Sequence, residues 1–220
     1  MKKTGILGGT FNPPHSAHLN MARAALAEAG LDEVIWIPNG DPPHKVPGVS
    51  ASDRLKMTEL AIAGEPRMTV SDIEISRPGR SYMAETLEIL SGREPDTRFF
   101  LICGEDMLSG LASWYRAARI FELADILAFQ RKGGSERKSE ITGAESLEVK
   151  FETEIGETVR FLERRGARIR VLEAKLPDIS STALRKALAE SRTEAGKLSA
   201  LIPKAVLSYI LEHGLYLEGL

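Results

Sequence analysis

Cysteine is almost absent from this chain of 220 residues, where Cys103 is the only one. A single thiol excludes an intramolecular disulfide and fits a reducing compartment, so we expect a cytoplasmic protein with a structural Cys103. An excess of one charge sign is also missing, because 29 Lys and Arg residues face 31 Asp and Glu residues. Binding to the nucleic-acid backbone relies on a basic face, so nucleic acid is not an expected partner.

Long hydrophobic runs are missing as well. No apolar stretch approaches the ~18 residues that a membrane-spanning helix needs. The segment MKKTGILGGTF carries two lysines, but Asn12-Pro13-Pro14 interrupts it before the apolar core of a secretory signal forms. With 43% hydrophobic and 27% charged residues, the composition predicts one globular domain over residues 1–220 and no membrane partner.

Short apolar runs alternate with helical stretches along the chain. This alternation predicts an α/β fold with a doubly wound, mostly parallel sheet. The expected strands are 4–7, 34–37, 68–75, 99–103, 126–129 and 169–172. The expected helices are 16–29, 53–63 with Ser52 as its cap, 81–90, 112–123, and two that start at Ser181 and at Pro203.

Two later segments differ from this regular pattern. Residues 133–168 are polar and read as a variable excursion with a helix near 158–165, and we assign them no function. Residues 178–220 are expected to form a C-terminal helical part.

Polar side chains gather in the turns that follow the predicted strands. In open parallel sheets the ligand lies beyond the carboxyl ends of the strands, so these turns are the candidate site. Three of the 4 histidines lie there: His15, His18 and His44. His15 and His18 share one face at a helix start, where imidazoles and free N–H groups attract an anion. The alternatives are a solvated histidine pair, or a zinc site of all three, which lacks a fourth ligand nearby.

Two further turns carry features of phosphate binding. Gly8-Gly9-Thr10-Phe11 follows a strand as a glycine turn, although neither GxxxxGK[ST] nor GxGxxG is present. The segment 178–185 places Ser180, Ser181 and Thr182 at a helix start with Arg185 one turn later. Hydroxyls and a guanidinium in that arrangement fit a multiply charged phosphate, although helix capping would explain one of the hydroxyls.

Aromatic residues follow the strand 99–103. Trp114 and Tyr115 come after Gly104-Glu105-Asp106, and Trp114 either packs in the core or stacks on a flat heterocycle. Trp36 lies inside a strand pattern and is expected in the core.

Two segments together resemble the signatures of the nucleotidylyltransferase superfamily. These are GGTFNPPHSAH at 8–18, similar to GGTFDPxHxGH, and ISSTALR at 179–185, similar to ISSTxxR. Pro43-His44-Lys45, Ser81-Tyr82 with Thr86, and Asp106 with Trp114-Tyr115 resemble the bacterial nicotinate-nucleotide adenylyltransferases within it. The resemblance covers nearly the whole chain. It departs at Ala17, where the family has Gly, and at Asn12, where Asp is commoner.

The resemblance implies transfer of the adenylyl group of ATP, with Mg²⁺, to nicotinate mononucleotide. Its catalytic residues would be His15, His18, Lys45 and Arg185. The implied ATP-binding residues are Gly8, Gly9, Thr10, Phe11, His15, His18, Ile179, Ser180, Ser181, Thr182 and Arg185. The implied residues for nicotinate mononucleotide are His44, Lys45, Thr86, Asp106, Trp114 and Tyr115.

Other functions stay open at this point. A sister enzyme would use nicotinamide mononucleotide or phosphopantetheine as the acceptor. A dinucleotide-binding oxidoreductase would need GxGxxG and an acidic residue that closes the second strand, whereas that strand ends in Pro38-Asn39. A non-catalytic nucleotide sensor would not need both histidines, Lys45 and Arg185. The sequence does not decide whether the chain forms a homo-oligomer.

Overall fold

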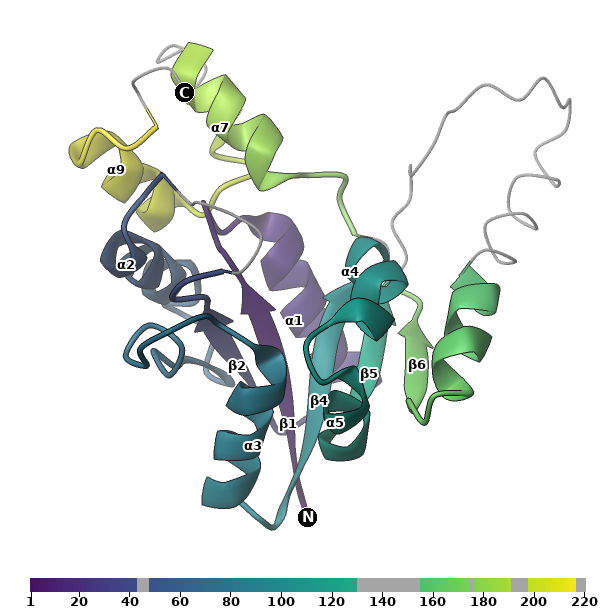
Figure 1. Ribbon diagram of the computed structural model, residues 1–220. Helices are drawn as coiled ribbons and strands as arrows, with labels where there is room; N and C mark the ends of the chain where they lie inside the picture. Colours follow the sequence, from purple (N-terminus) through teal and green to yellow (C-terminus); the bar gives the residue numbers. More distant parts are fainter. Residues whose placement is uncertain (43–47, 130–154, 175, 191–197, 217–220) are drawn as a thin grey trace, which may run out of the picture.

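The computed structural model describes residues 1–42, 48–129, 155–174, 176–190 and 198–216 (Figure 1). Within these residues, six strands form one sheet in the order β3-β2-β1-β4-β5-β6. Every neighbouring pair is parallel, so the predicted α/β class is confirmed. The strands are β1 (Lys2–Gly9), β2 (Glu33–Pro38), β3 (Met68–Val70), β4 (Thr97–Gly104), β5 (Ala124–Phe129) and β6 (Ile169–Leu172).

Helices cover both faces of the sheet. Successive strand residues point to opposite faces, so Leu7 packs into one apolar core and Ile6 into another. The first core is covered by α1 (Ser16–Glu28), α2 (Ala51–Ala61), α7 (Ser181–Glu190) and α9 (Lys204–Glu212). The second is covered by α3 (Met83–Arg93), α4 (Glu105–Gly110), the 3-10 turn η1 (Leu111–Ser113), α5 (Ala117–Leu123) and a helix over 155–163.

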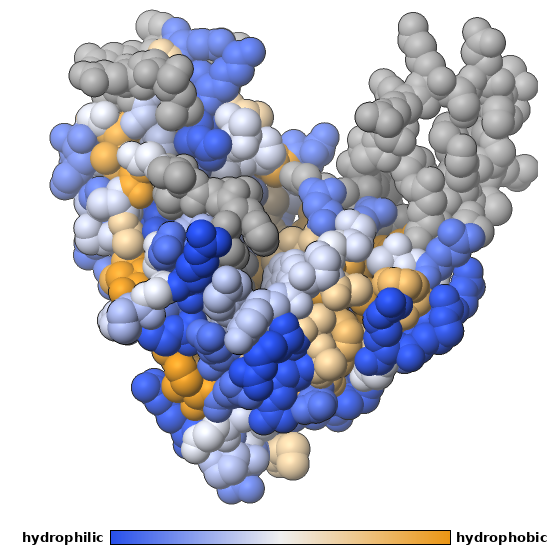
Figure 2. All heavy atoms as spheres, in the orientation of Figure 1, coloured by the Kyte–Doolittle hydropathy of each residue, from blue (hydrophilic) through white to orange (hydrophobic). Residues whose placement is uncertain are grey.

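The strand order places a crevice above the middle of the sheet. β1 pairs with β2 on one side and with β4 on the other. Strands β2 and β3 therefore extend the sheet in one direction from β1, and β4, β5 and β6 extend it in the other. Figure 1 shows α7 and α9 beyond the carboxyl end of β1, and Figure 2 shows a hollow between the α7 and α4 parts of the molecule. This is the switch point at which open α/β sheets bind ligands.

Three predicted elements differ from the structure. The third strand ends at Val70 rather than 75, because the chain turns there and buries Glu74, which is 1% exposed. The predicted helix 112–123 is interrupted at 114–116, where Arg116 takes a left-handed φ of 53°. Ser50, not Ser52, caps α2, since its Oγ accepts from the Asp53 N–H at 3.0 Å.

Other predicted features agree with the structure. Gly30 and Gly214 follow the ends of α1 and α9 with φ of 63° each, a conformation that glycine adopts without a Cβ clash. Trp36 is fully buried, and so is Cys103. In the part of the chain that is described, no helix combines the length and apolarity needed to cross a membrane.

Candidate active site

The loop after β1 turns at Phe11. Gly8 and Gly9 are the last residues of the strand, so the turn begins at Thr10, two residues later than expected. Phe11 holds φ of 48°, which a bulky residue adopts only where the surroundings fix it. Its ring is 2% exposed, and a Cβ on Gly9 would lie 3.2 Å from it. The glycine therefore leaves room for the ring that anchors the turn.

The two histidines of the first motif stack on each other. Their ring centroids are 3.8 Å apart, and the Phe11 ring meets His18 edge-on at 5.1 Å. The backbone N–H of His15, the residue before α1, donates to Nδ1 of His18 at 3.2 Å. Because Nδ1 accepts a hydrogen bond, the ring hydrogen of His18 lies on Nε2. His18 thus carries its donor on the nitrogen farther from the backbone.

The N-terminal and C-terminal motifs meet in space. Nη1 of Arg185 donates to the Asn12 carbonyl oxygen at 2.9 Å, and Oγ of Ser181 donates to the Pro13 carbonyl oxygen at 3.0 Å. Nη2 of Arg185 also donates to Oγ1 of Thr182 at 3.2 Å. A guanidinium has five N–H donors, so these bonds leave some for an anion. Residues that are 168 and 173 positions apart in sequence are thus joined directly, and Arg185 brings a positive charge to the turn after β1.

Capping explains part of the second motif. Oγ of Ser180 accepts from the Ala183 N–H at 3.2 Å, so Ser180 caps α7. Helix capping therefore explains one of the three hydroxyls, as the sequence pattern allowed. Its own O–H remains a donor. Ile179 is 7% exposed and packs in the core under α7, so it supports the motif from below.

A buried arginine lies behind the turn after β1. Arg54 of α2 is 1% exposed, and its guanidinium donates only to main-chain oxygens among the described residues. These are the carbonyls of Thr10 at 3.1 Å, Asn39 at 2.6 Å and Gly40 at 3.1 Å. Burial lowers the pKa of this guanidinium below its ordinary value. Arg54 therefore ties the turns after β1 and β2 together.

The turn after β2 is tied to the start of α3. The Gly40 N–H donates to Oγ of Ser81 at 2.9 Å, and a Cβ on Gly40 would lie 2.2 Å from the Glu74 carbonyl oxygen. The buried carboxylate of Glu74 accepts from Nδ2 of Asn39 at 2.8 Å and from Oγ1 of Thr86 at 2.7 Å. Thr86 itself is fully buried, and its N–H donates to the Tyr82 carbonyl at 3.2 Å.

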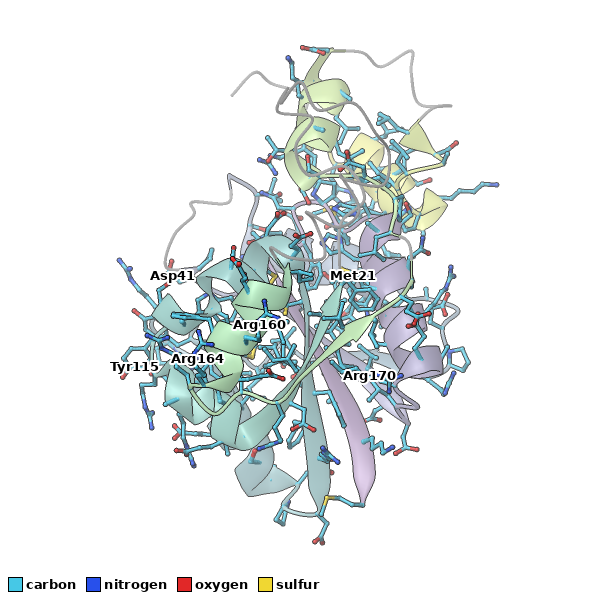
Figure 3. All side chains as sticks on the ribbon, turned by 90° about the vertical axis from the view of Figure 1, so that its right-hand side faces the viewer. Met21, Asp41, Tyr115, Arg160, Arg164 and Arg170 are labelled. Carbon is cyan, nitrogen blue, oxygen red and sulfur yellow. The ribbon has the colours of Figure 1, made fainter. Side chains whose placement is uncertain are left out.

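The aromatic pair after β4 lies between η1 and α5. Trp114 is half-buried and packs against the core under α3 and α5, while Tyr115 is 49% exposed and its ring contacts Tyr82 at 4.4 Å. Asp106 lies in the first turn of α4 and is exposed. Figure 3 shows Tyr115 and Asp41 on the side of the sheet opposite Met21 of α1. Trp114 and Tyr115 therefore lie on the α3–α5 face of the sheet, opposite α1.

Comparison with known proteins agrees with this geometry. The model of the cytidylyltransferase-like family matches residues 6–187. The chain belongs to the cytidylyltransferase-like family. A probable nicotinate-nucleotide adenylyltransferase of Synechococcus sp. (strain JA-3-3Ab) is 40% identical over 219 residues, which are 99% of this chain and 96% of that protein. One of Clostridium botulinum (strain Kyoto / Type A2) is 37% identical over 98% of this chain and 100% of its own.

Solved structures of similar fold belong to the same group. Plasmodium falciparum nicotinic acid mononucleotide adenylyltransferase complexed with NaAD has a TM-score of 0.74 at 17% identity, with 98% of both chains covered. Its complex with APC has a TM-score of 0.71 over the same share of both chains. At this identity the likeness concerns the fold, and it confirms the predicted nucleotidylyltransferase architecture.

The structure shows what surrounds the two residues of this cytidylyltransferase-like chain that depart from the family pattern, Ala17 and Asn12. Ala17, the second residue of α1, is 7% exposed and packs into the first apolar core. Oδ1 of Asn12 accepts a hydrogen bond from the Tyr216 hydroxyl, near the end of the described chain.

Some predicted residues lie outside the described part of the chain, and the sequence missed others. His44 and Lys45 are not among the described residues. Within the described residues, no three His, Cys, Asp or Glu side chains gather as metal ligands. Arg54, Glu74 and Tyr216 were missed. A lone charged residue such as Arg54 on a predicted helix, or Glu74 in a predicted strand, reads as solvated, and Tyr216 belongs to no motif.

Proposed function

We propose that this chain transfers the adenylyl group of ATP to nicotinate mononucleotide, forming nicotinate adenine dinucleotide and pyrophosphate. The meeting of the two motifs, through the bond from Arg185 to the Asn12 carbonyl, carries this proposal. Full-length relatives named nicotinate-nucleotide adenylyltransferase support it.

The reaction needs no protein nucleophile. A phosphate oxygen of the mononucleotide attacks the α-phosphorus of ATP, and the bond from that phosphorus to the bridging oxygen breaks as pyrophosphate leaves. The protein's task is to hold two polyanions in line and to stabilise charge at the α-phosphoryl group and on the leaving group.

On the ATP side, the proposal gives each motif a part of the triphosphate. Nε2–H of His18 donates to the α-phosphate as charge develops there, and His15 contacts the phosphates beside it. The backbone of the turn at Thr10 and Phe11, after Gly8 and Gly9, lines the nucleotide. The β- and γ-phosphates are assigned to the start of α7: Ser180, Ser181, Thr182 and Arg185, seated on Ile179.

On the acceptor side, the proposal places the pyridine ring against Trp114. The backbone N–H of Tyr115 would bind the nicotinate carboxylate, and Asp106 would orient the mononucleotide. The Thr86 N–H, which the family resemblance assigns to the same carboxylate, donates to the Tyr82 carbonyl oxygen at 3.2 Å, so it would have to exchange that bond for the substrate. Glu74 supports Thr86 through its bond to the Thr86 hydroxyl at 2.7 Å. Tyr82 supports Tyr115 through the contact between their rings.

Three further parts of the proposal rest on the sequence. Mg²⁺ enters with ATP, whose phosphate oxygens are the hard ligands this ion prefers. His44 and Lys45 would lie near the reacting phosphates, where a cation lowers the repulsion between two anions. The cytoplasmic location stays a prediction, and a homo-oligomer stays one possibility that the sequence left open.

Pyrophosphate release tests the function directly. Purified protein with ATP and Mg²⁺ receives nicotinate mononucleotide, nicotinamide mononucleotide or phosphopantetheine in separate reactions. We expect the highest kcat/KM with nicotinate mononucleotide, and a product mass equal to nicotinate adenine dinucleotide. A preference for either of the other acceptors would favour a sister enzyme, and no release with any acceptor would contradict adenylyl transfer.

A further inference from the structure

The loop that begins the ATP site is held from behind by residues of two other elements. Arg54 of α2 binds the Thr10 carbonyl, and the Tyr216 hydroxyl donates to Oδ1 of Asn12. Neither residue belongs to the two sequence motifs. Arg54 is 1% exposed, and Tyr216 is partly buried, which raises the pKa of its hydroxyl above its ordinary value.

The Arg54 contact fixes the direction of a peptide group. In a trans peptide the C=O and the following N–H point in opposite directions, so a Thr10 carbonyl that faces Arg54 turns the Phe11 N–H away from it. The turn after β2 obeys the same rule. There the Asn39 carbonyl faces Arg54 at 2.6 Å, and the Gly40 N–H points to Ser81 instead. The proposed role of the Phe11 backbone thus depends on this arginine.

The Tyr216 contact fixes the next residue of the same turn. Asn12 is bound at its side-chain oxygen by Tyr216 and at its main-chain oxygen by Arg185. The Tyr216 hydroxyl also lies within electrostatic reach of the Arg54 and Arg185 guanidinium groups. The Tyr216 phenol and Arg185 thus bind two different oxygens of the same residue of the turn.

Arg54 carries charge that no carboxylate of the described residues balances by an ion pair. Three carbonyl oxygens offset only part of the cost of burying a guanidinium. Nε of Arg54 is buried as well, with no hydrogen-bond partner among the described residues. A polyanion in the neighbouring crevice would lower this cost, because Coulomb interactions are stronger where water is excluded.

We propose that Arg54 and Tyr216 are positioning residues of the ATP site, which brace the turn from Thr10 to Asn12 so that its N–H groups and Arg185 face the triphosphate. This inference rests on the proposed adenylyl transfer. It concerns the nucleotide side of the site and not the acceptor side.

Tyr216→Phe is the main test, because it removes one hydroxyl and keeps the ring. Tyr209→Phe is the matched control. The Tyr209 hydroxyl donates to Oδ1 of Asp53 at 2.8 Å, so its bond links α9 to α2 and is not made to the turn itself. Both variants lose one phenol hydrogen bond, and urea unfolding measures the loss of stability in each.

The kinetic readout separates positioning from general stability. We expect Tyr216→Phe to lower kcat/KM for ATP about 3- to 10-fold, the range for one lost hydrogen bond, and to leave KM for nicotinate mononucleotide unchanged. Affinity for a non-hydrolysable ATP analogue should fall by a similar factor. Tyr209→Phe should retain both kinetic values whatever its stability.

Arg54→Lys extends the test, since an ammonium cannot reach three carbonyls in the geometry of a planar fork. We expect it to lower kcat/KM for ATP more than Tyr216→Phe does. Wild-type kinetics in Tyr216→Phe, or an equal loss in Tyr209→Phe, would overturn the inference. A wild-type protein that releases no pyrophosphate would instead contradict the proposed function, which separates the two failures.

Discussion

The His18 side chain has two roles: it caps α1 and, in the proposed reaction, it donates to the α-phosphate. Substitutions that keep one of these roles and remove the other can separate them. Its Nδ1 accepts from the His15 N–H at 3.2 Å, while its Nε2 carries the hydrogen assigned to the α-phosphate. In asparagine, Oδ1 is as far along the side chain as Nδ1 is in histidine. In glutamine, Nε2 takes the place of the histidine Nε2.

His18→Asn should therefore keep the cap and lose the catalytic donor. We expect kcat to fall roughly 10²–10⁴-fold, the scale for a lost transition-state donor or proton-transfer group. The free energy of unfolding should stay within about 1 kcal/mol of the wild type, because the bond to the His15 N–H survives.

His18→Gln should show the opposite pattern. Losing the acceptor for the His15 N–H should cost about 0.5–2 kcal/mol of stability, as for other helix caps. Turnover should fall less than in His18→Asn, since an amide N–H still reaches the α-phosphate.

Pyrophosphate release at saturating substrates and urea unfolding of the same preparations check both expectations. Near-normal turnover in His18→Asn would remove His18 from the mechanism. Activity losses that simply follow the stability losses across both variants would show that His18 serves the fold alone.

Three more predictions follow from separate parts of the structure. Trp114→Ala should raise KM for nicotinate mononucleotide and leave KM for ATP unchanged; unaltered acceptor affinity would contradict stacking. Burial raises the pKa of the Cys103 thiol from 9.0 to about 12. Above pH ~9 the unfolded chain loses this proton and the folded chain keeps it, so the free energy of unfolding should decrease by about 1.4 kcal/mol for each pH unit. Urea unfolding from pH 8.5 to 10.5 should show this slope relative to Cys103→Ala, and equal slopes would refute it. Gly40→Ala places a Cβ 2.2 Å from the Glu74 carbonyl oxygen and should cost about 1–3 kcal/mol. Gly92→Ala, where nothing lies within 4 Å, is the matched control and should not destabilise the protein in thermal unfolding.

Local patterns gave most of the elements of the fold. Apolar runs and glycine breaks predicted all six strands of the described sheet, because a buried parallel strand must be apolar on both faces. They failed at 112–123, since the break at Arg116 depends on contacts that the sequence alone does not display. Arg116 and Arg119 of that segment both bind Glu88 of α3, which anchors α5 from another element.

The motifs by themselves indicated the family and the residue types of the phosphate site. Imidazole, hydroxyl and guanidinium donors near helix starts are typical of anion binding, and their spacing is visible in the sequence. Only the tertiary structure decided how these donors are held. Arg185 meets Asn12 across 173 positions of sequence, and Arg54 binds carbonyls of two separate turns. Such contacts arise from the packing of α2, α7 and the segment after α9 around one strand order. No local pattern encodes which carbonyl a buried arginine will face, and so the support of the site became visible only in three dimensions.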